Sequence, residues 1–366
     1  MSDEPLQRLN RVFSGRTVLV TGHTGFKGSW LSEWLLLLGA RVVGFSLPPP
    51  TQPSLFEDLA LASRLQHIVG DICDLATVTG VVRDAAPDFV FHLAAQPLVR
   101  LSYREPVQTY AVNVLGTAHV LEAIRDLARP CVAVGVTTDK CYENREWLYA
   151  YREEDPLGGY DPYSSSKAAA ELVIAAYRRS FFQQAGIQLA SARAGNVIGG
   201  GDWAVDRIVP DCIRALDRGE PIAVRNPYAT RPWQHVLEPL GGYLALAAAV
   251  AESDNPAQFT TAFNFGPDLD SNRDVRTLVT EILKHRTGTW RDDSDPGAHH
   301  EAQRLNLAVD KACHLLGWRP LWGFERTIAE TVRWYVEAPK GHAAALTRAQ
   351  INAYANEAST AQAWAR

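Results

Sequence analysis

Tyr163 and Lys167 stand four residues apart in a segment with a helical pattern. Residues at this spacing lie on one face of a helix, so the phenol and the ammonium become neighbours. A nearby cation favours the phenolate and lowers the pKa of a tyrosine from its usual value of about 10. We therefore expect Tyr163 to act as a base that removes the proton of an alcohol. An ordinary surface pair is the alternative that this short pattern leaves open.

Thr138, Asp139 and Lys140 form a second group of reactive side chains, directly after the apolar run Cys131 to Val136. A hydroxyl, a carboxyl and an amine in succession provide a hydrogen-bond donor, an acid and a base. Lysine is scarce here, since only six of the 36 basic residues are lysines. Unlike a guanidinium, a desolvated ammonium can lose its proton, so Lys140 is a candidate base. The alternative is a polar loop after a strand.

A glycine-rich turn, residues 21–28, follows the apolar run 17–20 and precedes a predicted helix over residues 25–38. Glycines here permit a tight turn and let the backbone approach a pyrophosphate, which the N-terminus of the helix attracts. The spacing differs from the usual GxGxxG pattern, and a purely structural turn is the alternative. We expect the turn to bind a dinucleotide, with Lys27 serving the turn or the cofactor rather than catalysis; its contact residues would be Gly22, Thr24, Gly25, Phe26, Lys27 and Gly28.

The ends of the next two apolar runs are expected to reach the adenosine half of that dinucleotide. The run 41–45 ends at Ser46, without the carboxylate that often binds the ribose and without an adjacent arginine. We expect Ser46 to hydrogen-bond the 2′-hydroxyl, which favours NAD over NADP. Asp71 and Ile72 follow the third run and would reach the adenine, unless Asp71 caps the next helix.

Continuous apolar runs of this kind are typical of strands buried on both faces of a sheet. They occur at residues 17–20, 41–45, 66–69, 88–93, 131–136, 188–193 and 263–265. Helical patterns alternate with many of them, which predicts a doubly wound α/β fold with a parallel sheet. A long helix is expected to begin at Asp161-Pro162, where the aspartate caps and the proline occupies the first turn.

The composition changes near Gly199, where Arg, Trp and Pro become more frequent. We predict a dinucleotide-binding domain over residues 1–198 and a smaller, mixed α/β substrate lobe over residues 199–366. Residues 236–266 are expected to return to the main domain, because 263–265 has the pattern of one of its strands. The Ala-rich tail, residues 340–366, is predicted to be helical and to pack on the body or at a subunit interface.

Charge and cysteine content exclude several classes of protein. The net charge of −5 provides no basic surface for nucleic acid, and no apolar run approaches the length of a membrane span. The N-terminus lacks the layout of a secretory signal. The five cysteines contain no CxxC pair, so reduced thiols in a cytoplasmic enzyme without a metal site are expected.

Four motifs together resemble the extended short-chain dehydrogenase/reductase superfamily in order and spacing. They are Thr21-Gly22-x2-Gly25-x2-Gly28, His92-Leu93-Ala94-Ala95, Asn113-Val114-x-Gly116-Thr117 and Tyr163-x3-Lys167. The resemblance extends to about residue 337. It implies a Rossmann-type fold, a C-terminal lobe for a nucleotide sugar, and Thr138 as the hydroxyl that holds the sugar's C4 oxygen. Further cofactor contacts are implied for Leu93, Ala94, Ala95, Thr137, Tyr163 and Lys167.

Three longer segments resemble one group within this superfamily, the CDP-glucose 4,6-dehydratases. They are Thr138 to Asn144, Arg193 to Trp203 and Arg231 to Val236. The resemblance implies that Tyr163 removes the C4 hydroxyl proton as hydride leaves for NAD. Lys140 would then abstract the C5 proton, and Asp139 would protonate the departing C6 hydroxyl. Return of the hydride to C6 and of a proton to C5 gives a 4-keto-6-deoxy sugar, a precursor in deoxysugar biosynthesis.

The same resemblance implies a CDP-hexose as partner, an NAD that is regenerated in each turnover, and a homodimer or homotetramer. The implied substrate contacts are Gln96, Arg193, Asn196, Trp203, Arg207 and Arg231. Dehydration of another nucleotide-hexose stays open, because the choice of cytosine depends on the resemblance alone. So do an NAD-dependent 4-epimerase, which would need neither Asp139 nor Lys140, and a nucleotide-sugar-binding protein without activity.

Overall fold

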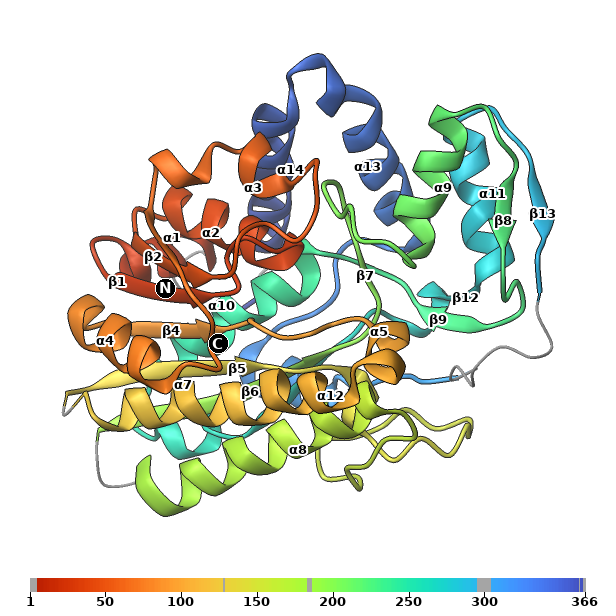
Figure 1. Ribbon diagram of the computed structural model, residues 1–366. Coiled ribbons are helices and arrows are strands. Elements are labelled where there is room, and N and C mark those ends of the chain that lie inside the picture. The colour runs from red at the N-terminus through yellow and green to blue at the C-terminus, as the bar shows by residue number, and fades with distance from the viewer. Residues whose placement is uncertain (1–4, 128, 183–185, 295–303, 362, 365–366) are drawn as a thin grey trace.

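A sheet of seven strands forms the centre of the protein, in the order β11-β6-β5-β4-β1-β2-β3 (Figure 1). The computed structural model describes residues 5–127, 129–182, 186–294, 304–361 and 363–364. The strands are β1 Thr17–Thr21, β2 Arg41–Ser46, β3 Gln66–Val69, β4 Phe89–His92, β5 Cys131–Val136, β6 Ile187–Ala194 and β11 Ala262–Phe265. All neighbouring pairs are parallel, which confirms the predicted doubly wound α/β fold.

Both faces of the sheet are buried along its central strands, as the continuous apolar runs predicted, whereas the edge strand β3 has no fully buried residue and was wrongly expected to be covered on both faces. Val18 and Val20 of β1 pack into one core, while Leu19 between them packs into another. This alternation follows because successive side chains of a strand point to opposite faces. Helices α4 Leu75–Ala85, α7 Gly116–Arg125 and α8 Pro162–Tyr177 cover the second core, and α2 Phe26–Leu37 and α10 Leu237–Glu252 cover the first (Figure 1).

The strand order reverses between β1 and β4, whose carboxyl ends therefore border a crevice. Thr21 ends β1, His92 ends β4 and Val136 ends β5. Each predicted motif of the dinucleotide site and of the reaction centre thus begins at this one edge of the sheet. The long helix α8 begins as predicted, because the Asp161 side chain accepts a hydrogen bond from the Ser164 N–H and Pro162 occupies the first turn.

A smaller group of elements lies beyond this edge, on the right of Figure 1. Strand β7 pairs with β10, β9 with β12, and β8 with β13, each as a separate two-stranded sheet. These elements are β7 Val197–Ile198, α9 Ile208–Asp217, β8 Ile222–Val224, β9 Thr230–Pro232, β10 Gln234–His235, β12 Asn272–Asp274, α11 Val275–His285 and β13 Trp290–Asp292. Between them, α10 and β11 pack into the main domain, on β5 and β6.

The remaining helices connect or flank these two parts. They are α1 Pro5–Phe13, α3 Leu55–Asp58, α5 Val99–Arg104, α6 Pro106–Tyr110, α12 Asp310–Leu316, α13 Phe324–Glu337 and α14 Ala343–Thr360. Short turns of other helix types are η1 Leu61–Ser63, η2 Ala111–Leu115, η3 Asp139–Cys141, η4 Arg178–Phe182, η5 Pro256–Gln258, η6 Leu269–Ser271 and η7 Ala338–Lys340. Within the described ranges, every helix falls short of the length and hydropathy that a bilayer span requires.

The tail helix α14 packs on the body of the protein. Arg348 donates to the buried Glu33 of α2 at 2.7 Å, and Tyr354 donates to the buried Glu238 of α10, also at 2.7 Å. Of the two positions that the sequence left open for this tail, the structure therefore shows packing on the body.

Candidate active site

The glycine turn between β1 and α2 has the geometry that a dinucleotide needs. Gly22 has a φ of +77°, and a Cβ there would lie 2.7 Å from the backbone nitrogen of Ala94. A Cβ at Gly28 would lie 2.1 Å from the Gly22 carbonyl oxygen. Gly25 caps α2 without a side-chain hydrogen bond, so no capping side chain covers the first N–H groups of the helix. These residues fit a diphosphate, since free N–H groups at a helix N-terminus bind anions.

Two hydroxyls, one within this turn and one at the end of β2, lie within hydrogen-bond distance of each other. Thr24 Oγ1 lies 2.9 Å from Ser46 Oγ and donates to the carbonyl of Leu47, also at 2.9 Å. Both residues were predicted to contact the cofactor, and the structure brings them together. Neutral hydroxyls of this kind suit a ribose hydroxyl as their hydrogen-bond partner.

The loops after β3 and β4 correct part of the sequence analysis. Asp71 does not cap the next helix, because Asp74 is the residue that caps α4, whereas Asp71 accepts a bond from the Cys73 N–H at 2.9 Å. The Ile72 side chain is buried in the core against Gly116, which leaves only its backbone for an adenine contact. Next to the turn, Leu93 and Ala94 approach Gly22, and Ala95 follows them.

Gln96 is a residue for which the structure argues against the predicted substrate contact. Its side-chain amide donates to Thr109 at 2.9 Å, and its side-chain oxygen accepts the N–H of Leu98. Its backbone N–H donates to Asn113 at 2.8 Å. The amide is therefore occupied in holding the loop between β4 and α5.

The reaction centre forms where β5 ends and α8 begins. Thr138 caps the turn η3, and its hydroxyl donates to Asp139 Oδ1 at 2.9 Å. The same hydroxyl lies close enough to Tyr163 to lower the pKa of the phenol, which places the acid and the phenol on either side of one hydroxyl. Thr138, Asp139, Tyr163 and Lys167 are all buried. The structure thus brings together four of the five residues predicted to catalyse, and Lys140 follows them in η3, partly buried.

Burial shifts these groups towards their neutral forms. It raises the pKa of Asp139 above its usual value, although Lys140, Thr138 and Arg231 oppose the shift. It lowers the pKa of Lys167 to about 8, against the attraction of Glu171. Burial also raises the pKa of Tyr163 to about 12, although Thr138 and Arg207 lower it. The expected net lowering of the Tyr163 pKa is therefore wrong, because loss of hydration outweighs the attraction of nearby cations.

Arg193 lies beneath the reaction centre, where the structure argues against the predicted contact with a substrate diphosphate. It is 4% exposed, and its Nη2 donates to Glu171 Oε2 at 2.8 Å. Its Nη1 donates to Tyr142 Oη at 2.8 Å and to the carbonyl of Glu153 at 3.0 Å. Thr137, predicted to contact the cofactor, directs its hydroxyl into the same cluster and donates to Glu171. These side chains link the ends of β5 and β6 to α8 through Glu171.

Two other arginines do face the reaction centre. Arg207 lies close enough to influence both Lys27 and Tyr163 electrostatically, and its Nη1 donates to Asp202 at 3.4 Å. Arg231, at the centre of β9, influences Asp139 in the same way. Both side chains are partly exposed, unlike that of Arg193. Solvent can therefore reach these two guanidinium groups, whereas Arg193 is buried.

The structure does not support the predicted substrate role of Trp203, and it leaves that of Asn196 untested. The Trp203 indole packs edge to face against Tyr335, with ring centroids 5.1 Å apart, which favours packing over stacking on a base. The backbone carbonyl of Asn196 accepts the N–H of Gln234 at 3.3 Å where β7 meets β10, which places its half-buried side chain near the end of β6.

Two residues of the site were missed by the sequence analysis. Glu171 continues the spacing of Tyr163 and Lys167 by another four residues, and this regular spacing could have identified it. Tyr243 lies within the apolar helix α10, where its Oη accepts a hydrogen bond from Lys27 Nζ at 2.9 Å. No local signal distinguishes Tyr243 from the core residues around it.

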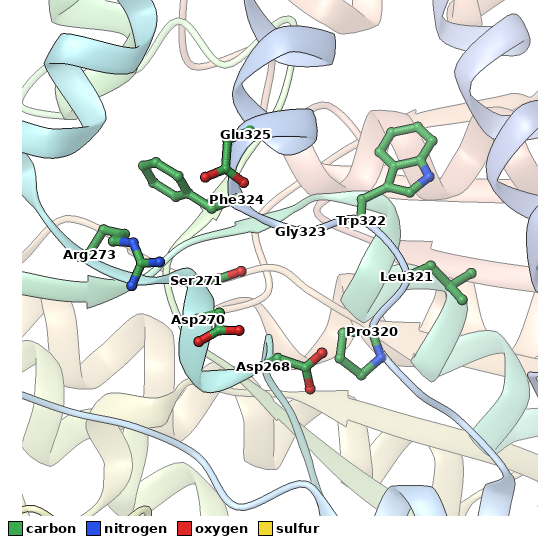
Figure 2. Close-up of a pocket in the computed structure, with 10 residues that line it drawn as sticks. All are labelled: Asp268, Asp270, Ser271, Arg273, Pro320, Leu321, Trp322, Gly323, Phe324 and Glu325. Carbon is green, nitrogen blue, oxygen red and sulfur yellow. The ribbon is translucent and has the colours of Figure 1, made fainter.

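A cavity of about 450 Å³ between the substrate lobe and the start of α13 contains none of the predicted site residues. Figure 2 shows acidic and aromatic side chains around it, with Arg273 among them. Its lining is Asp268, Asp270, Ser271, Arg273, Pro320, Leu321, Trp322, Gly323, Phe324 and Glu325. Among the described residues, no group of three or more His, Cys, Asp or Glu is placed to hold a metal ion. We assign no chemistry to this cavity.

Comparison with known proteins agrees with this geometry. The family model for GDP-mannose 4,6 dehydratase matches residues 19–331. The chain is 47% identical over 333 residues to the CDP-glucose 4,6-dehydratase of Salmonella typhimurium, covering 88% of this chain and 91% of that protein. It is 29% identical over 343 residues to a dTDP-glucose 4,6-dehydratase of Xanthomonas campestris, covering 87% and 93%.

A solved structure has a similar fold: the UDP-glucose 4-epimerase of Thermus thermophilus in complex with NAD. It is 25% identical with a TM-score of 0.72, and the match covers 87% of this chain and 99% of that one. Since the family model spans most of the chain and the Salmonella relative matches it along almost its whole length, the chain belongs to the nucleotide-sugar 4,6-dehydratases and is a hydro-lyase.

Proposed function

We propose that the protein converts CDP-D-glucose into CDP-4-dehydro-6-deoxy-D-glucose. The observation that carries this proposal is the buried acid Asp139, which shares the Thr138 hydroxyl with Tyr163 and has Lys140 beside it. Oxidation at C4 requires only the hydroxyl and the phenol, so the added acid and amine support a second reaction, the elimination of water. The 47% identity to the Salmonella CDP-glucose enzyme supports the choice of substrate.

NAD is the cofactor that we propose for the glycine turn. Gly22, Gly25 and the first turn of α2 would hold its diphosphate, and Thr24 and Ser46 its adenosine ribose. When bound, NAD supplies the acceptor for the C4 hydride and later the donor of the same hydride to C6. The neutral hydroxyls of Thr24 and Ser46 favour a ribose 2′-hydroxyl over a 2′-phosphate, so we propose NAD rather than NADP.

Tyr163 removes the C4 hydroxyl proton in this proposal, and Thr138 donates a hydrogen bond to the C4 oxygen. Because burial raises the pKa of Tyr163, the phenolate must be stabilised by positive charge in the site. Lys167 and Arg207 provide that charge. The ketone formed at C4 acidifies the C5 hydrogen, which allows the second stage to begin.

Lys140 then removes the C5 proton, and Asp139 delivers a proton to the departing C6 hydroxyl. After the hydride has reached C6, a proton returns to C5 and completes the product. An acid must carry its proton at neutral pH in order to donate it, and burial raises the pKa of Asp139 in that direction. Arg207 and Arg231 are the residues that we propose for the substrate diphosphate, because a guanidinium binds phosphate oxygens in a bidentate manner.

A second copy of the chain is the partner that we propose for an apolar face on η2 and the helices around it. This face is formed by Val107, Tyr110, Ala111, Val114, Leu115 and Ala169. Val107 is 81% exposed and Leu115 is 57% exposed, which is unusual for side chains of this kind when they gather. A homodimer would cover them, and light scattering of the wild type and of Val107→Glu measures the expected dimer and its loss.

Incubation with CDP-D-glucose labelled with deuterium at C4 tests the proposed function. We expect a product that has lost one water and carries the label in its new methyl group, without added NAD. A product of unchanged mass and inverted C4 would instead indicate the epimerase. Parallel reactions with dTDP-, UDP- and GDP-hexoses test the nucleotide, and a lack of turnover with all four would reject the enzymatic assignment.

A further inference from the structure

Lys27 and Tyr243 form a contact between the glycine turn and the helix α10. Lys27 Nζ donates to Tyr243 Oη at 2.9 Å and lies 5.1 Å from the centre of its ring. Tyr243 is fully buried, whereas Lys27 retains part of its exposed surface. The lysine therefore borders the site, while the tyrosine anchors it to the core.

The direction of this hydrogen bond determines what the Tyr243 hydroxyl can do. In its ammonium form Lys27 has three donors and no acceptor, so in that form the Tyr243 oxygen accepts and its own O–H is available to donate. This hydroxyl makes no second hydrogen bond within the part of the chain that the structure describes. A buried donor without an acceptor is costly, which points to a partner supplied when the site operates.

The groups that face this pair belong to the reaction centre. Lys27 is influenced by Lys167 of α8, by Arg207 before α9 and by Asp139 of η3, and burial together with the two cations lowers its pKa to about 7. Tyr243 is in turn influenced by Tyr163 of α8. The helix α8, the turn η3 and the start of α9 thus each present a residue of the proposed reaction to this contact.

We propose that Lys27 and Tyr243 are a second lysine–tyrosine pair, a positioning pair that directs the Tyr243 O–H towards the negative charge of the Tyr163 phenolate, the form that accepts the C4 proton. This inference rests on the proposed function. Lys27 fixes the orientation of the hydroxyl and adds a positive charge, and Tyr243 presents the dipole. Such preorganised donors act most strongly in a site that excludes water.

The pair provides part of the stabilisation that the Tyr163 phenolate needs. Burial raises the pKa of Tyr163 to about 12, so its ionisation near neutral pH needs more than one source of stabilisation. Thr138 and Arg207 provide part of it. Lys27 and Tyr243 approach from the glycine turn and α10, and they add a cation and a donor from a different direction.

Four variants test the pair: Lys27→Met, Lys27→Arg, Tyr243→Phe and the double variant Lys27→Met/Tyr243→Phe. We expect Lys27→Met and Tyr243→Phe each to lower kcat by about 10-fold, with the KM for the nucleotide-hexose within about twofold. The double variant should fall no further than either single one, because the two residues act as a unit. Lys284→Met, at an exposed lysine of α11, is the matched control and should behave as wild type.

The pH profile of kcat separates this role from a structural one. Removal of the Lys27 charge makes the Tyr163 phenolate less favourable, so the acidic limb of the profile should move to higher pH by about one unit in Lys27→Met. Lys27→Arg keeps the charge and should keep that limb in place. Tyr243→Phe is the safeguard against poor folding of the lysine variants, since it preserves the ring that packs in the core.

Three results would overturn the pair: unchanged kcat and pH profile, independent losses that add in the double variant, or a raised KM or lost NAD with full kcat at saturation. The last result would make Lys27 a ligand-binding residue. All variants are assayed on whichever CDP-, dTDP-, UDP- or GDP-hexose the wild type dehydrates. Failure of the proposed substrate therefore shows in the wild type, and failure of the pair shows only in the variants.

Discussion

Two buried regions of the site treat charge differently. In the first, which we call the paired layer, Glu171 and Arg193 form a buried ion pair with an Oε2–Nη2 distance of 2.8 Å. In the second, the reaction centre, Asp139 and Lys167 are buried without a comparable ion pair in the described chain. Burial opposes charge in both regions. In the paired layer Arg193 nevertheless lowers the pKa of Glu171, and Glu171 raises the pKa of Arg193. At the reaction centre burial prevails, raising the pKa of Asp139 and lowering that of Lys167 to about 8.

This difference shows how one fold can both fix charges and exchange protons within a few residues. Glu171 accepts bonds from Thr137, Ser191 and Arg193, so every one of its partners favours the carboxylate. Asp139 accepts one from Thr138, and its raised pKa favours the acid. Groups whose environments move their pKa values apart are the ones that can serve as acid and base. The bonds of the paired layer link β5, β6 and α8, and these elements position the reaction centre.

Asp139→Asn should have the largest effect, because it removes the proton donor and keeps the shape of the side chain. We expect the rate of water loss to fall by about 10³-fold, equivalent to about 4 kcal/mol, with little change in stability. Mass spectrometry of the product measures this loss. Oxidation at C4 should persist, since Tyr163 and Thr138 are unchanged, and transient reduction of the bound cofactor would report it. An unaltered rate of dehydration would remove Asp139 from the mechanism.

Glu171→Gln tests the paired layer in the same way. The substitution leaves the Arg193 charge buried without a carboxylate, and breaking a buried pair in this manner costs about 3 kcal/mol or more. Denaturant unfolding measures the free energy. The matched control is Glu220→Gln, whose pair with Arg218 has the same 2.8 Å distance but is more than half exposed, and which should cost less than about 0.5 kcal/mol. Equal losses in the two variants would mean that burial does not distinguish the pairs.

Local spacing explains why much of the fold and part of the site were predictable from the sequence. Strand positions follow from continuous apolar runs, and Tyr163 and Lys167 lie together because both belong to one helix. The glycine turn needs only its own residues and the strand before it. Thr138 and Asp139 lie beside Tyr163 because the ends of parallel strands share one edge of the sheet.

Long-range packing explains what the sequence could not reveal. Arg193 and Arg231 are the same residue type in equally specific motifs, and only the packing of α8 on β6 places Glu171 against the first of them. Tyr243 is 216 positions away from Lys27, within a helix whose pattern is apolar throughout. The Trp203 indole likewise could pack or stack until Tyr335 was seen against it. A single sequence contains no signal for such pairs.

Glu238 lies outside the reaction centre, yet burial raises its pKa as it raises the pKa of Asp139. It accepts bonds from the Trp322 N–H and the Tyr354 hydroxyl, both at 2.7 Å, yet burial raises its pKa to about 7. A pKa raised on folding gives stability that is complete below the unfolded value of about 4.5 and is lost as the pH rises through about 7. Relative to Glu238→Gln, the wild type should therefore lose roughly 2 kcal/mol between pH 5 and pH 8.

Unfolding of wild type and Glu238→Gln at both pH values measures this difference. A gap that does not change with pH would show that Glu238 is charged throughout. Glu220→Gln, at an exposed carboxylate paired with Arg218 at 2.8 Å, serves as the control and should show no such trend.

The smallest expected effect separates the two arginines directly. Arg231→Lys keeps the charge but loses the planar fork, and because Arg231 faces Asp139 from a partly exposed position on β9, we expect the loss to appear in substrate binding. The KM for CDP-D-glucose should rise by about 10-fold, or about 1.4 kcal/mol, with unchanged stability.

Arg193→Lys should do the reverse, since a lysine cannot replace the bonds to Glu171, Tyr142 and Glu153 together. Its unfolding free energy should fall while the KM of the folded fraction stays the same. If Arg193→Lys instead raised the KM and left the unfolding free energy unchanged, the Arg193 guanidinium would contact the substrate. Arg193 would then belong to the reaction centre and not to the paired layer.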